Sequence, residues 1–62
     1  MPHLNKLLER LKAAQVDLIM QAAAVDMLPS DGTIRRIAEL ENAIAAVEAL
    51  IHEQRNSIKA VA

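Results

Sequence analysis

The sequence predicts an all-α fold: an antiparallel hairpin of two long helices that associates as a homodimeric four-helix bundle. Three observations predict it. The single glycine and one of the two prolines meet in one short break, and apolar residues recur at heptad spacing on both sides of that break. A second apolar stripe on the first helix would be left uncovered by the hairpin itself.

Length and composition allow one small domain, residues 1–62, and no internal cross-links. The chain has 62 residues, 53% of them hydrophobic, and it contains neither cysteine nor aromatic residues. A chain this short makes a marginal core and has no disulfide to support it. We therefore expect a partner chain to supply the missing contacts.

The break fixes the predicted elements. The first helix is expected over about residues 3–28, the loop over about 29–32 and the second helix over about 31–59. Pro2 suits a helix start, and Pro29 disfavours helical geometry at Leu28. Ser30 or Asp31 is expected to cap the second helix. A loop this short makes the helices antiparallel neighbours.

A heptad pattern on both helices predicts the seam between them. In the first helix the a positions are Leu4, Leu11, Leu18 and Val25, and the d positions are Leu7, Ala14, Gln21 and Leu28. In the second helix the a positions are Ile37, Ile44, Ile51 and Ile58, and the d positions are Leu40, Val47, Gln54 and Val61. The predicted core is Leu4, Leu11, Leu18, Val25, Ile37, Leu40, Ile44, Val47, Ile51 and Ile58. Folding at the loop should place Leu18 near Ile44 and Leu11 near Ile51.

Gln21 and Gln54 interrupt the apolar d positions. A buried amide without partners costs about 1–3 kcal/mol. Two interpretations of Gln21 stay open: it fixes the register of the bundle, as polar core residues do in coiled coils, or it turns to the rim. Gln54 lies near the end of the chain, where it could reach water.

The second apolar stripe predicts the dimer interface. It consists of Val16, Met20, Ala23 and Met27, spaced i, i+4, i+7 and i+11. A two-fold axis between Gln21 and Ala22 would place Val16 against Met27 of the partner, as an isologous dimer requires. The second helix has a fainter stripe of small residues, namely Ile34, Ala38, Ala45 and Ala49.

The charge distribution favours an antiparallel dimer. The open end of the hairpin has five basic and two acidic residues, whereas the loop end has six acidic and two basic ones. Head-to-tail packing brings opposite ends together, although exposed charges contribute only about 0–1 kcal/mol a pair. The overall net charge of −1 and the lack of aromatic residues argue against nucleic acid as a partner.

The sequence offers no constellation of residues typical of an enzyme, a metal site or a cofactor site. His3 and His52 are the only imidazoles, and no zinc-binding spacing or glycine-rich phosphate loop occurs. Arg35 and Arg36 lie unfavourably at the positive end of the second helix, where Arg35 is expected to pair with Glu39. We expect a non-catalytic protein without cofactors.

These features predict a protein–protein interaction or oligomerisation module, homodimeric through the methionine–alanine stripe. The stripe could instead hold a helix of another protein, as an adaptor or chaperone would. The plan of a doubled helical hairpin resembles the Rop-type RNA-binding proteins in architecture only, which implies a nucleic-acid-binding regulator as a further alternative. Asp17 and Asp26 interrupt the longest weakly charged stretch, so we expect no membrane span and a cytoplasmic location.

Overall fold

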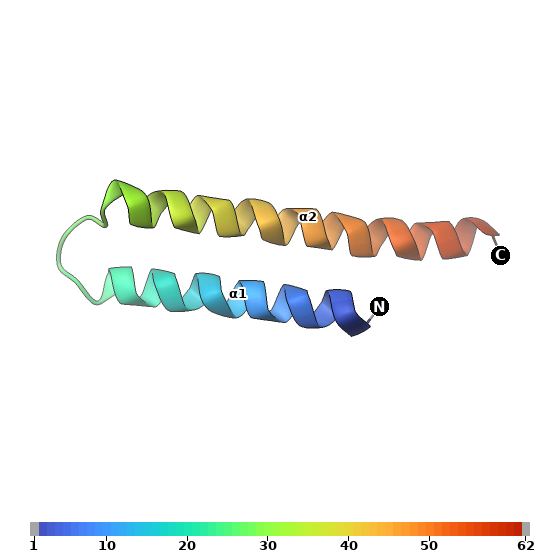
Figure 1. Ribbon diagram of the computed structural model, residues 1–62, viewed down its shortest axis with the longest axis horizontal. Coiled ribbons are helices and arrows are strands. Elements are labelled where there is room, and N and C mark those ends of the chain that lie inside the picture. Colours follow the sequence, from blue (N-terminus) through green and yellow to red (C-terminus); the bar gives the residue numbers. More distant parts are fainter. Residues whose placement is uncertain (1, 62) are drawn as a thin grey trace.

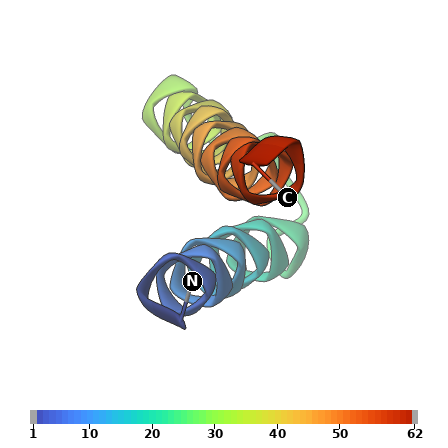
Figure 2. The same ribbon diagram turned by 90° about the vertical axis from the view of Figure 1, so that its right-hand side faces the viewer.

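The chain forms an antiparallel hairpin of two packed α-helices. In the computed structural model, which describes residues 2–61 and the side chains of residues 2–56, α1 spans Pro2–Ala23 and α2 spans Asp31–Val61. Figure 1 shows the two helices side by side with α2 extending past the start of α1. Figure 2 shows that their axes are inclined to one another. The predicted all-α hairpin is confirmed.

The helices make a rod rather than a globule. The principal extents are 53 × 17 × 12 Å and the radius of gyration is 15.2 Å. A compact chain of the same length would have a radius of gyration of about 10–11 Å. Because the described residues form only these two helices, each helix is covered by the other on one side at most.

The start of α2 follows the predicted capping chemistry. The Ser30 hydroxyl accepts a hydrogen bond from the Thr33 amide at 3.2 Å, and the Ser30 carbonyl accepts the first helical bond from Ile34 at 3.0 Å. Ser30 is therefore the N-cap. Asp31, the alternative, occupies the first turn, where its carboxylate faces the positive end of the helix.

The first helix ends earlier than predicted, at Ala23 instead of about residue 28. The Val25 amide bonds to the Ala22 carbonyl at 3.3 Å, a tightening typical of a last turn. Continuing the helix would have placed Asp26 at its negative end and β-branched Val25 within it, and both are unfavourable. The loop consequently spans residues 24–30.

The longer loop moves the point about which the chain folds back. The Gln15 amide donates a hydrogen bond to Glu41 at 2.8 Å, and the Lys12 ammonium lies 3.4 Å from a Glu48 carboxylate oxygen. The predicted register would have put Gln15 nearest Val47 and Lys12 nearest Leu50. Both contacts are therefore displaced toward the loop, as expected when the loop is centred nearer Met27 than Ser30.

The inward stripe of α2 follows the predicted heptad, whereas that of α1 is rotated. In α2 the least exposed residues include Ile37, Leu40, Ile44, Val47 and Ile51. In α1 they are Leu4, Leu8, Leu11, Gln15, Leu18 and Ala22, so each d position is replaced by the residue after it. A stripe that steps by three and then four residues and a stripe that steps by four and then three both stay on one face of a helix. The sequence pattern alone therefore does not decide between the d positions and the residues that follow them. Gln15 can lie in the stripe because Glu41 accepts its hydrogen bond.

Two predicted core residues need comment. Val25 is 58% exposed, since it lies in the loop beyond the end of α1, and its assignment to the core was wrong for the hairpin. Ile58, predicted opposite Leu4, lies outside the residues whose side chains are described.

Candidate interaction surface

The hairpin buries almost none of its apolar side chains. Among residues 2–56, Ile44 is the one buried hydrophobic residue, with 5% of its surface exposed. Leu4, Leu11, Leu18, Ile37, Leu40, Val47 and Ile51 of the predicted core are half-buried. Two helices can shield one stripe on each other but cannot enclose it, because both flanks of the seam stay open to solvent.

The exposed apolar residues gather in the half of the hairpin near the loop. Nine large hydrophobic residues are exposed among residues 2–56, and only Leu7 and Leu50 belong to the open half. The others are Val16, Ile19, Met20, Val25, Met27, Leu28 and Ile34. Isolated exposed hydrophobics are ordinary, but so many in one half of a small hairpin are consistent with an interaction surface.

The Lys12–Glu48 ion pair shows which flanks of the two helices form a common face. It bridges α1 and α2 on one side of the seam. With 100° of rotation per residue, Ile19, Val16 and Ala23 lie on the same flank of α1 as Lys12. By the same rotation Ile34, Ala38 and Ala45 lie on the flank of α2 that carries Glu48.

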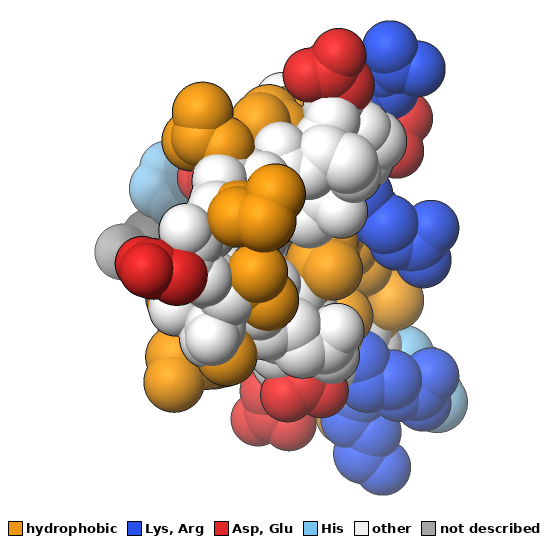
Figure 3. Space-filling model, turned by 90° about the vertical axis from the view of Figure 1, so that its left-hand side faces the viewer, with side chains coloured by type: hydrophobic (Ala, Val, Ile, Leu, Met, Phe, Trp, Pro, Cys, Tyr) orange, Lys and Arg blue, Asp and Glu red, His pale blue; other side chains and the backbone are white. Residues whose placement is uncertain are grey.

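Together these residues form a surface that we call the apolar face: Val16, Ile19, Met20 and Ala23 of α1 with Ile34, Ala38 and Ala45 of α2. All seven are exposed in the single chain. Figure 3, viewed from the loop end, shows apolar side chains over the centre and left, with lysine and arginine gathered on the right. The two stripes that the sequence presented separately thus lie side by side.

Of the predicted interface residues, the structure places three together and separates one. Val16, Met20 and Ala23 lie on the exposed flank of α1, and Met20 is 64% exposed. Met27 is 76% exposed but lies in the loop, so it does not continue the helical stripe. The predicted two-fold axis between Gln21 and Ala22 paired Val16 with Met27 of the partner on the assumption that both residues lie on one helix. Because Met27 lies in the loop, that assumption does not hold.

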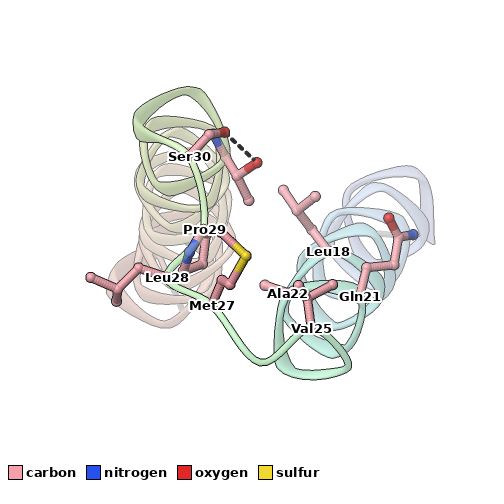
Figure 4. A pocket seen from close by; sticks show the side chains of 9 residues that line it. Leu18, Gln21, Ala22, Val25, Met27, Leu28, Pro29 and Ser30 are labelled. Carbon is pink, nitrogen blue, oxygen red and sulfur yellow. Dashed lines mark hydrogen bonds between the residues drawn. The ribbon is translucent and has the colours of Figure 1, made fainter.

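An open hollow of about 300 Å³ lies where the loop meets the helices. Leu18, Ala22, Val25, Met27, Leu28 and Pro29 supply its apolar lining, and Gln21, Ser30 and Thr33 line it as well. Figure 4 shows these side chains bordering the space between α1 and the start of α2. A second hollow of about 220 Å³ lies between the helices and is lined by Ala14, Asp17, Leu18, Gln21, Arg36 and Leu40.

Gln21 lines both hollows and is exposed, so in the single chain it lies at the rim of the seam. Gln54, the other predicted polar position, is half-buried. Neither amide is enclosed in the hairpin. Gln21 is exposed because the rotated inward stripe of α1 contains Ala22 in its place.

The charged residues are solvated. Lys12–Glu48 is the one ion pair found among the described side chains, and the two partners are 53% and 50% exposed. The expected Arg35–Glu39 pair is not formed; Arg36 instead borders the second hollow together with Asp17. No group of histidines and carboxylates suited to a metal ion occurs within the part of the chain described.

The signal that sequence reasoning missed was Ile19. It follows the inward position Leu18 and lies on the same flank as Lys12, so it enlarges the apolar face toward the seam. A helical wheel of α1 centred on its observed inward stripe, instead of on the predicted heptad, places Ile19 beside Val16 and Ala23.

Comparison of the chain with protein-family models, with curated proteins and with solved structures gives no match in any of the three. None of the helices in the described part of the chain combines the length and the apolar character needed to span a membrane.

Proposed function

We propose that this chain is a non-catalytic oligomerisation module whose apolar face binds a second copy in an antiparallel homodimer, completing a four-helix bundle. Two observations together support it best: Ile44 is the one buried hydrophobic residue among residues 2–56, and the apolar face is exposed. The hydrophobic effect favours covering such a face, by about 25 cal/mol for each Å² of apolar surface.

The accessible area supports a partner of substantial size. The single chain exposes 5148 Å². A compact protein of the same mass would expose about 4,000 Å² by the usual scaling of area with mass. The excess is about 1,100 Å² for each chain and so about 2,300 Å² for two chains, which is of the order buried in total by the interfaces of obligate homodimers, about 2,000 Å² or more.

The composition of the face supports a second copy as the partner. An isologous interface requires that one surface fit itself, so bulky and small residues must both be present on it. Val16, Ile19, Met20 and Ile34 provide the bulk, and Ala23, Ala38 and Ala45 provide the space. A helix of another protein would fit the same face and remains the alternative occupant.

The nucleic-acid alternative gains little support from the arrangement of charges. That alternative would need a basic surface formed by the five basic residues of the open end, namely Lys6, Arg10, Lys12, Arg55 and Lys59. Lys12 lies on the opposite flank from Lys6 and Arg10 and is paired with Glu48. Lys6 and Arg10 share their side of the hairpin with the carboxylate of Asp17.

Two matched substitutions test the proposal. Ala45 and Ala46 are adjacent, both exposed and both interior to α2, but only Ala45 belongs to the apolar face. Ala45→Asp should weaken self-association measured by analytical ultracentrifugation, whereas Ala46→Asp should leave it near the wild-type value. Equal effects of the two substitutions would contradict the assignment of the face.

A further inference from the structure

We propose that the two copies overlap only at their loop halves, in a staggered antiparallel dimer whose open ends project in opposite directions. The inference rests on the proposed homodimer and specifies its geometry. Its basis is the uneven distribution of exposed apolar residues along the face.

The apolar face does not extend to the open half of the hairpin. On the same flank, the open half presents Asn5, Glu9, Lys12, Glu48 and His52, all of them exposed. The Lys12–Glu48 ion pair crosses this part of the surface. Apart from Glu41, one side of the hairpin is therefore divided into an apolar half near the loop and a charged half near the termini.

This division disfavours a dimer in which the hairpins overlap along their whole length. Full antiparallel overlap would seat the apolar half of each copy on the charged half of the other. In that arrangement Lys12, Glu48 and Glu9 would all lie within the interface and lose part of their water, and removing charges from water is costly. A stagger that joins only the loop halves leaves those charges solvated.

The residue sizes place the two-fold axis. With α1 ending at Ala23, its exposed stripe is centred between Ile19 and Met20. An axis at that level puts Val16 of one copy against Ala23 of the other. On α2 the Gln15–Glu41 and Lys12–Glu48 contacts place this level between about residues 36 and 41, and an axis midway between residues 39 and 40 sets Ile34 against Ala45 of the second copy. These two pairings each join a larger residue to a smaller one, and at the axis itself Ile19 meets Met20 of the second copy.

The charge at the loop end favours the antiparallel stagger over a parallel dimer. Asp26 and Asp31 lie in or beside the loop. A parallel dimer would bring both acidic loop ends together, whereas the stagger separates them by about 20 Å along the bundle, from a 1.5 Å rise per residue. Charges at that separation are largely screened, because the Debye length is about 8–10 Å at ordinary salt concentrations.

One like-charge contact remains and provides a control. Glu41 lies between Ala38 and Ala45 on the flank that faces the axis, so the two copies of Glu41 approach each other in the staggered dimer. Glu41→Gln should strengthen dimerisation several-fold at low salt, and the gain should shrink as salt is added. In a fully overlapped dimer the two copies of Glu41 are far apart, and no such gain is expected.

Spin-label distances test the geometry directly, because the chain has no cysteine and accepts single labels. His3→Cys places a label at the open end, and Asp26→Cys places one in the loop; both native residues are exposed and outside the apolar face. Labelled proteins whose sedimentation mass and helix content match the wild type are measured by double electron–electron resonance.

The stagger predicts about 50 Å between the two labels at His3 and about 20–30 Å between those at Asp26, from 1.5 Å per residue. Full overlap predicts the reverse order, about 30 Å at His3 and more than 40 Å at Asp26. A parallel dimer predicts short distances at both positions. Either of the last two results would overturn the stagger and leave the homodimer standing, whereas a monomer by sedimentation would overturn both.

Discussion

The hydroxyl oxygen of Ser30 accepts a hydrogen bond from the amide of Thr33, 3.2 Å away, and this bond fixes the start of α2. The two hydroxyl groups are also within hydrogen-bond distance, at 3.0 Å. Because the loop joins the helices here, the cap sets where α2 begins relative to α1 and so helps to set the register of the apolar face.

Removing the cap should destabilise the protein measurably. Ser30→Ala leaves the Thr33 amide without its side-chain acceptor and should lower the free energy of unfolding by about 1 kcal/mol. Urea denaturation followed by circular dichroism measures the change. Ser30→Asp, which restores an acceptor oxygen, is the control and should stay close to the wild type. No loss in Ser30→Ala would show that the cap is unimportant.

Gly32→Ala should stabilise the protein. Gly32 lies in the first turn of α2 without positive φ, and a Cβ placed there would meet only the Ser30 hydroxyl oxygen at 3.9 Å. Alanine restricts the unfolded chain and favours the helix, so the midpoint of urea unfolding should rise by the equivalent of about 0.4–1 kcal/mol. A lower midpoint would mean that the first turn has a conformation alanine cannot adopt.

Ile44 should be the most sensitive apolar position within the hairpin. Ile44→Ala truncates the one buried hydrophobic side chain among residues 2–56 and should cost about 2–5 kcal/mol, enough to unfold a small protein. Ile44→Val, expected to cost about 0.5–1.5 kcal/mol, keeps the effect measurable if the alanine variant does not fold. Leu50→Ala, at an exposed position outside the apolar face, is the comparison and should cost less. Equal losses of unfolding free energy in Ile44→Ala and Leu50→Ala would contradict the assignment of Ile44 to the seam between the helices.

The Lys12–Glu48 ion pair should contribute little to stability. Its partners are about half exposed and 3.4 Å apart. A double-mutant cycle with Lys12→Ala and Glu48→Ala should give a coupling energy of about 0.2–1 kcal/mol that falls as salt is added. A larger coupling that is insensitive to salt would indicate that the pair is buried in the assembly, which the staggered dimer does not allow.

Much of the fold followed from the sequence because its signals were local. The cap at Ser30 and the heptad of α2 each act within a few residues, and the structure shows both. Pro29 lies just before the start of α2, whereas Gly32 lies within its first turn. The end of α1 was missed because no glycine or proline marks residues 24–28, and the balance there depends on weaker effects at Val25 and Asp26.

The apolar face could be predicted only in part. Periodicity identified Val16, Met20 and Ala23 as a stripe, and Ile34 and Ala38 as another. That the two stripes share one side depends on the rotation of α1 about the seam, and the Gln15–Glu41 hydrogen bond between the helices helps to set that rotation. A single sequence gives the spacing along each helix but not the angle between the stripes of two helices.

Sedimentation equilibrium of the wild-type chain and of Met20→Asp at micromolar concentration tests the central claim most directly. The wild type should have twice the 6.8 kDa mass of one chain, and Met20→Asp should lose association because it places a charge in the apolar face. A wild-type mass equal to one chain, or unchanged association in Met20→Asp, would contradict it.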